Sequence, residues 1–126
     1  MAYINASISN SPTIVGERKE EIKDIAHTFV KFDSDGKLEQ AGTGEVAIGI
    51  VIGLVEDEDT MYTVQIKDMG LIKAGAEIKV GQAIAVGDNG KAKVATTGEY
   101  IMGYCTRGAA EGGLAQIQIT KSGKEA

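Results

Sequence analysis

The sequence predicts an all-β fold: a small sandwich or barrel built from two pseudo-repeated halves, with an extended N-terminal arm. The first observation is an internal sequence repeat. Asp35-Gly36-Lys37, Thr43-Gly44-Glu45 and Gly49 return as Asn89-Gly90-Lys91, Thr97-Gly98-Glu99 and Gly103, with one spacing of 54 residues throughout. The second is a series of short apolar segments separated by turn residues, and the third is a content of 17 Gly with a single Pro. Together these indicate many strands joined by tight turns.

A chain of 126 residues is long enough to form one domain with a core of its own. We expect residues 14–121 to form that domain, with halves at about 14–67 and 70–121. Residues 1–13 form the predicted arm, and residues 122–126 a frayed, polar tail.

The arm is small and polar, and Ile4, Ala6 and Ile8 share one parity within it. That alternation suits one face of a strand. Two interpretations remain open, a frayed tail or an arm that adds to the sheet of another chain. Residues 17–26 place apolar side chains at helical spacing, but their counterpart around residues 76–81 does not, so this stretch is expected to be an irregular connection or a single turn.

In the first half, strands are expected at residues 27–33, 37–41, 45–55 and 60–67. Asp35-Gly36 is a strong hairpin signal between the first two. The centre of 45–55 is apolar on both parities, which is typical of a strand covered on both faces.

The second half repeats this order. A short strand or a crossing is expected at residues 69–74, and strands at 82–87, 91–95, 99–106 and 114–121, which makes about nine strands in the whole chain. Asn89-Gly90 marks the second hairpin, and residues 108–113 form a glycine-rich loop.

The repeated glycines fall into two classes. Gly36, Gly44, Gly90 and Gly98 stand at turns, where a positive φ favours glycine. Gly49 and Gly103 interrupt strands, which indicates a bulge or a close backbone approach. The simplest interpretation of these two is that the halves cross there.

No catalytic, cofactor or metal site is predicted. His27 is the only histidine and Cys105 the only cysteine, so no internal disulfide and no zinc cluster can form. Both are expected to be structural. Asp33-Ser34-Asp35-Gly36 has its glycine too early for a calcium loop and lacks the twelfth-position carboxylate. The acidic run 56–59 is expected to stay solvated.

The repeat also pairs two glutamates and two lysines. Glu45 and Glu99 could approach one another as paired carboxylates, but each follows a Thr-Gly corner and is expected to cap it or point to solvent. Lys37 and Lys91 follow their turns rather than occupying the apex, which disfavours a swinging-arm carrier lysine.

The charge pattern narrows the class of partners. A formal net charge of −5 without a basic, aromatic-rich stripe disfavours nucleic-acid binding. The N-terminus lacks the regions of a signal peptide, and no apolar run approaches a membrane span of ~20 residues.

Through the order and spacing of these elements, residues 14–121 resemble the phage capsid decoration, or cement, proteins. The resembling stretches are Phe29–Asp33, Asp35–Lys37, Ala41–Glu45, Ile48–Ile50, Gly75–Ile78, Gly81-Gln82, Gly87-Asp88, Gly90–Ala92 and Gly98-Glu99. The resemblance implies a structural protein on the outside of a phage head, which bridges major capsid subunits and stabilises the capsid. It also implies a homo-oligomer, with a trimer favoured, made in the bacterial host cytoplasm.

The family has no catalytic residues to carry over. The expected capsid or oligomer contacts are Tyr3, Ile4, Ala6, Ile8 and Ile14. The alternative is a protein of another class, a cytoplasmic small-molecule or carrier module with a duplicated β-barrel.

Overall fold

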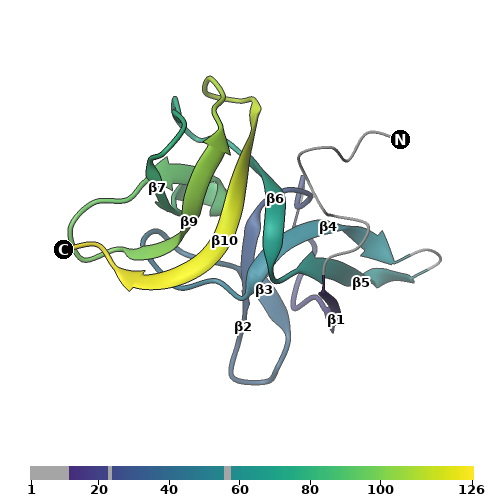
Figure 1. The fold of residues 1–126 in the computed structure, drawn as a ribbon. Coiled ribbons are helices and arrows are strands. Elements are labelled where there is room, and N and C mark those ends of the chain that lie inside the picture. The colour runs from purple at the N-terminus through teal and green to yellow at the C-terminus, as the bar shows by residue number, and fades with distance from the viewer. Residues whose placement is uncertain (1–11, 23, 56–57) are drawn as a thin grey trace.

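In the computed structural model, which describes residues 12–22, 24–55 and 58–126, ten strands form two five-stranded sheets (Figure 1). The first sheet contains β1 (Thr13–Glu17), β2 (Phe29–Phe32), β3 (Leu38–Gln40), β4 (Gly49–Val55) and β5 (Glu58–Gln65). The second contains β6 (Asp68–Lys73), β7 (Ala83–Val86), β8 (Ala92–Val94), β9 (Tyr100–Arg107) and β10 (Leu114–Lys124). Apart from the 3-10 turn η1 (Asp88–Gly90), no helix is found in these ranges.

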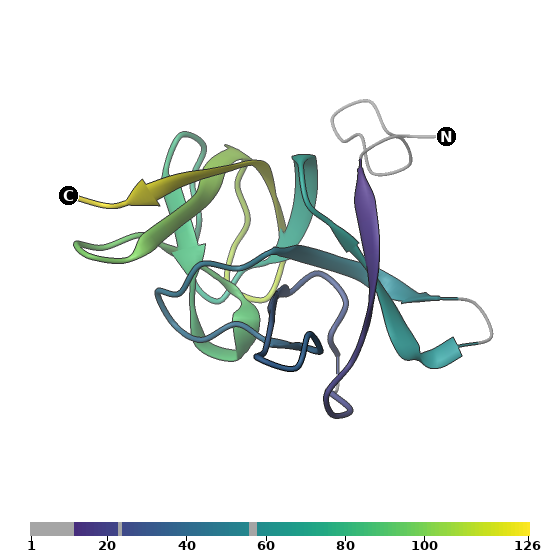
Figure 2. The same ribbon diagram turned by 90° about the horizontal axis from the view of Figure 1, so that it is seen from below.

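The two sheets have the same topology. Their strand orders are β1-β5-β4-β2-β3 and β6-β10-β9-β7-β8, and every strand pair within them is antiparallel. Each strand of one half therefore has a counterpart in the other, and the two halves lie side by side as lobes (Figure 2). This confirms the predicted all-β fold with two pseudo-repeated halves.

Each sheet also curls until its two edges meet. Arg18, just after β1, makes a parallel bridge to Leu38 at the start of β3, and Ala74 makes the matching bridge to Ala92. The N–H groups of Lys19 and Gly75 donate to the carbonyls of Leu38 and Ala92. Closure of this kind leaves fewer unpaired backbone groups at the edges.

The two hairpin turns are closed by equivalent backbone hydrogen bonds. The N–H of Asp33 donates to the carbonyl of Lys37 at 2.8 Å, and the N–H of Gly87 to that of Lys91 at 2.7 Å. Gly36 and Gly90 have φ of +78° and +70°, and Gly44 and Gly98 have +76° and +86°. Positive φ is strained for residues with a Cβ, so these turns retain glycine in both copies.

Two apolar clusters make up the core. The smaller fills the first half and contains Val30, Leu38, Val51, Tyr62 and Val64. The larger fills the second half and extends to four residues of the first half: Phe29, Ala41, Ala47 and Ile50. The halves are thus joined by a shared core.

Gly49 and Gly103 mark a close approach of backbones, but not a crossing of the two halves. A methyl group on Gly49 would lie 3.0 Å from the carbonyl carbon of Gln65, and one on Gly103 would lie 3.0 Å from that of Gln118. Its distance to each carbonyl oxygen would be shorter still. Because Gln65 and Gln118 belong to the same half as the glycine they crowd, the predicted crossing is wrong.

The two ends of the chain also differ from the sequence interpretation. Residues 1–11 of the predicted arm lie outside the described residues, whereas Thr13 already pairs with Gln65 in β1. The tail interpreted as frayed continues β10: Gly123 pairs with Ile101, and Lys124 pairs with Tyr100. A polar composition did not reveal these main-chain bonds.

Candidate functional site

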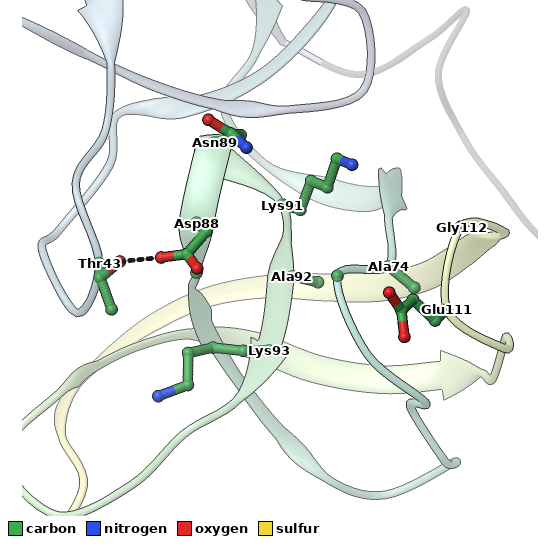
Figure 3. Close-up of a pocket in the computed structure, with 11 residues that line it drawn as sticks. Thr43, Ala74, Asp88, Asn89, Lys91, Ala92, Lys93, Glu111 and Gly112 are labelled. Atoms are coloured by element: carbon green, nitrogen blue, oxygen red, sulfur yellow. Dashed lines mark hydrogen bonds between the residues drawn. The ribbon is translucent and has the colours of Figure 1, made fainter.

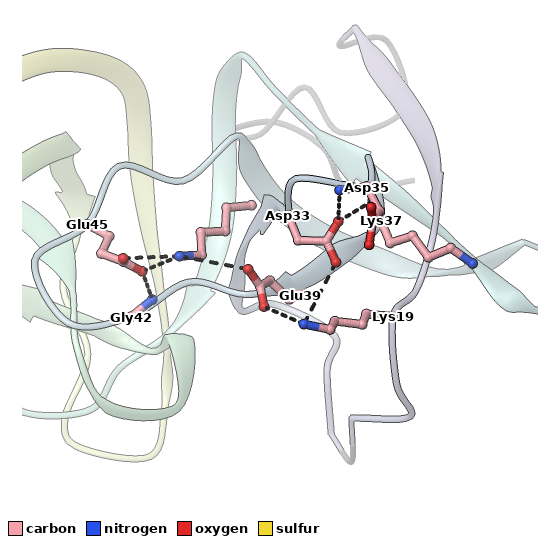
Figure 4. A network of polar contacts seen from close by, with 8 residues as sticks. Lys19, Asp33, Asp35, Lys37, Glu39, Gly42 and Glu45 are labelled. Carbon is pink, nitrogen blue, oxygen red and sulfur yellow. Dashed lines mark hydrogen bonds and ion pairs between the residues drawn. The ribbon is translucent and has the colours of Figure 1, made fainter.

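The two repeated glutamates cap their own corners. Oε1 of Glu45 accepts a hydrogen bond from the N–H of Gly42 at 2.6 Å, and its carboxylate binds Nζ of Lys31 at 2.8 Å (Figure 4). Oε1 of Glu99 accepts from the N–H of Thr96 at 2.8 Å, and Lys93 binds its carboxylate at 2.8 Å. The geometry shows two equivalent structural caps, each satisfied by donors of its own half.

These bonds favour the charged carboxylates. Hydrogen bonds from Lys31 and then Gly42 hold the pKa of Glu45 below its ordinary value. Burial alone raises the pKa of Glu99, but hydrogen bonds from Lys93 and Thr96 outweigh it and lower that pKa as well. A general acid needs a raised pKa, so neither group is suited to donate a proton at neutral pH.

The surface around the first hairpin is a network of opposite charges (Figure 4). Lys19 lies 3.9 Å from both Asp33 and Glu39, and Lys37 lies 3.3 Å from Glu17. Oδ1 of Asp33 also accepts from the N–H groups of Asp35 and Lys37, so this carboxylate builds the turn. The lysines of these pairs are largely exposed, so the ion pairs contribute little to stability.

A polar cleft of about 400 Å³ lies on the second half, and the first half contributes only Thr43 to its lining (Figure 3). It is lined by Thr43, Ala74, Gly75, Gly87, Asp88, Asn89, Lys91, Ala92, Lys93, Glu111 and Gly112. A second hollow shares Asn89, Lys91 and Gly112 with it and reaches Lys73. Lys93 is engaged by Glu99, and Thr43 by Asp88, so the cleft walls are tied by polar bonds between side chains.

His27 serves the joint between the halves. Its N–H donates to the carbonyl of Val51, and its carbonyl accepts from the N–H of Lys73 in the second half. Burial lowers the pKa of the half-buried imidazole, partly opposed by a hydrogen bond to the backbone of Leu71. Cys105 is buried, and burial raises the pKa of its thiol, which disfavours the reactive thiolate.

Within the described ranges, no group of three or more His, Cys, Asp or Glu side chains could hold a metal ion. The same ranges contain no helix that is long and apolar enough to cross a membrane. Of the acidic run 56–59, the first two residues lie outside those ranges.

Most of the expected contact residues cannot be placed. Tyr3, Ile4, Ala6 and Ile8 lie outside the described residues. Ile14 lies in β1, pairs with Val64 and packs, partly buried, against the smaller core cluster. In the described part of the chain, six large apolar side chains are exposed: Val15, Phe32, Val46, Val80, Tyr104 and Leu114.

Comparison with known proteins adds one informative result. No family model and no curated protein matches the chain. Among solved structures, it is similar to the crystal structure of the head fiber gp8.5 N base in bacteriophage phi29. The TM-score is 0.72 at 21% identity, over 91% of this chain and 98% of that one. At this identity the likeness establishes a shared fold that includes both halves.

Proposed function

We propose that the protein is a structural component of a phage virion, which binds the outer surface of the head and stabilises the capsid by bridging major capsid subunits. The observation that carries the proposal is the shared duplicated fold, because it extends over nearly all of both chains and the similar protein is a phage head fiber base. Fold alone does not specify function, so the binding surface has to be tested directly.

Two further features support a structural role over catalysis. The repeated carboxylates are consumed in corner caps, and the buried thiol has a raised pKa. A net charge of −5 also suits a protein displayed densely outside a DNA-filled shell, because it disfavours binding to the DNA.

The partner in this proposal is the major capsid protein, and the protein acts as a homo-oligomer, with a trimer expected. Repetition over a lattice allows each contact to be weak, because neighbouring contacts raise the effective concentration. We expect the chain to be made in the bacterial host cytoplasm and to end on the capsid exterior.

The experiment is co-sedimentation with expanded, DNA-free heads of the phage that encodes the chain. Wild-type protein should pellet with the heads and saturate at a fixed ratio to the major capsid protein. Unexpanded heads provide the matched control, since the expected bridge spans subunits in their expanded positions. Protein that stays in the supernatant with both kinds of head would contradict the proposal.

The same samples address a carrier or small-molecule module. Intact-mass measurement of the protein purified from its host should give the unmodified chain mass. A lysine adduct on Lys37 or Lys91, or a retained small molecule, would favour that alternative.

A further inference from the structure

The contact between the two halves is asymmetric. The first half contributes four side chains to the larger core cluster: Phe29, Ala41, Ala47 and Ile50. On the second half, Val86, Gly90 and Tyr100 take part in the contact, and Met102 and Gly70 lie against Ala47 and Ile50. The N–H of Gly44 donates to the carbonyl of Val86 at 2.9 Å, and its carbonyl accepts from the N–H of Tyr100 at 3.0 Å. The two halves therefore contribute different, non-equivalent positions to the contact between them.

The repeat spacing identifies the faces that this contact leaves over. On the second half, the counterparts of Phe29, Ala41 and Ile50 are Ala83, Ala95 and Tyr104, which we term the second open face. The counterpart of Ala47 is Ile101, which is buried and is not part of this face. On the first half, the counterparts of Val86, Gly90 and Tyr100 are Phe32, Gly36 and Val46, the first open face.

Exposure differs clearly between two buried contact residues and their counterparts. Ile50 is 2% exposed, whereas Tyr104 is 38% exposed. Val86 is fully buried, whereas Phe32 is 40% exposed. Three of the six exposed large apolar side chains in the described ranges (Phe32, Val46 and Tyr104) thus lie at positions whose counterparts belong to the contact between the halves.

The glycines agree. A methyl group on Gly90 would come within 2.9 Å of both Gln40 and the carbonyl oxygen of Phe29, because the first half packs onto that turn. A methyl group on the equivalent Gly36 would have no heavy atom within 4 Å, apart from its chain neighbours. The turn that is covered in the second half is open in the first.

We propose that the two open faces bind one another between copies of the chain, so that the second half of one molecule packs on the first half of the next. The contact would repeat the one already present inside the molecule. Inside the molecule, the large Phe29 and the smaller Val86 belong to one core cluster. Their counterparts on the open faces are the small Ala83 and the large Phe32. A small residue on one face opposite a large one on the other preserves the packed volume.

The C-terminal segment occupies part of this place. The N–H of Gly98 donates to the carbonyl of Glu125 at 2.9 Å, as that of Gly44 does to Val86. Oγ1 of Thr97 donates to the carbonyl of Ala126 at 3.3 Å, and at the equivalent corner Oγ1 of Thr43 donates to the side-chain Oδ1 of Asp88. The segment thus satisfies the corner that a neighbouring copy would otherwise bind, and Glu125 and Ala126 have to be displaced for full contact.

Such a contact is head-to-tail, because it joins two different faces. Head-to-tail contacts close into rings or extend as filaments, according to the rotation between copies. This inference deepens the oligomeric part of the proposed function by naming the surface. It is measured without capsids, so it can fail while capsid binding holds, and the reverse.

The test is sedimentation velocity of the full chain over a range of concentrations. Phe32→Lys and Tyr104→Lys each place a charge on one open face, and Val15→Lys places one at an exposed apolar position outside both. We expect each open-face variant to weaken self-association at least about tenfold, because desolvated apolar anchors dominate interface energies. Val15→Lys should associate like wild type, and all three should melt near the wild-type temperature.

The decisive sample is an equimolar mixture of the Phe32→Lys and Tyr104→Lys proteins. Each retains the face that the other lacks, so the mixture should form heterodimers and nothing larger. A mixture that stays monomeric, or that restores the wild-type oligomer, overturns a head-to-tail contact. Wild-type-like association of either single variant also overturns it.

Removal of Glu125 and Ala126 should strengthen association, because the corner is then free. If both this truncated protein and wild type remain monomeric at concentrations of about 1 mM, a dissociation constant in the range of weak contacts is excluded and the proposal fails.

Discussion

Gly49→Ala should destabilise the protein more than the addition of a methyl group at any other glycine of β4. The new Cβ would lie 2.9 Å from Cγ1 of Val64 and 3.0 Å from the carbonyl carbon of Gln65. The carbonyl cannot rotate away without loss of the pairing between β4 and β5, in which Ile50 faces Gln65. Overpacking against backbone costs about 3 kcal/mol, at the upper end of the usual range.

Gly53 provides the matched control. It lies in the same strand, and a methyl group there would have no heavy atom within 4 Å, apart from its chain neighbours. Since glycine is unfavourable in strand interiors, Gly53→Ala should be neutral or stabilising by up to about 1 kcal/mol.

The assay is thermal unfolding followed by far-UV circular dichroism, with a urea titration to obtain the free energy of unfolding. At about 4 °C per kcal/mol for a domain of this size, Gly49→Ala should lower the Tm by about 12 °C. Gly103→Ala should behave similarly, since Gln118 crowds it in the same way. Equal melting temperatures for Gly49→Ala and Gly53→Ala would refute the reasoning.

Three further predictions concern the hairpin glycines, the capping Glu99 and the N-terminal residues. Gly36→Ala and Gly90→Ala should each lower the free energy of unfolding by about 1 kcal/mol, because both glycines have a positive φ. The loss should be larger for Gly90→Ala, because the first half packs on that turn. Equal losses in urea titrations would argue against that packing. Because the pKa of Glu99 is lowered in the folded protein, its charged carboxylate stabilises the fold at pH values above its ordinary pKa of 4.5. This contribution disappears as the pH falls through the lower pKa of the folded state. Over that pH window, the urea midpoint of wild type should therefore fall more than that of Glu99→Gln. Deletion of residues 2–11 retains β1 from Thr13, so the Tm should stay within a few degrees while occupancy on heads falls; unchanged occupancy would remove the arm from the binding surface.

The duplication could be predicted because turn chemistry is local. Positive φ at Gly36 and Gly90 restricts the residue type whatever lies around it, so the spacing survives in the sequence. The strand β1 could not be predicted so easily, because Gly16 interrupts its apolar pattern. A methyl group on Gly16 would lie 2.7 Å from Cδ1 of Leu38, so that glycine reflects packing between segments far apart in sequence.

The two open faces could not be predicted from the sequence. Tyr104 and Ile50 occupy equivalent strand positions, and sequence alone does not show which of them the other half covers. The pairing of Gly123 with Ile101 was missed for a related reason, since main-chain hydrogen bonds do not require an apolar side chain. Equivalence between halves was readable from the spacing, but the choice of face required the structure.

The central claim, that the protein is a structural part of a phage virion, is tested most directly by protein quantification of purified particles. The proposal predicts a phage whose purified virions contain the chain at one constant ratio to the major capsid protein in every preparation, as measured by mass spectrometry. After mild dissociation, the heads should lose both the protein and part of their resistance to heat. Its absence from purified virions, with abundant protein in the infected-cell lysate, would contradict the account.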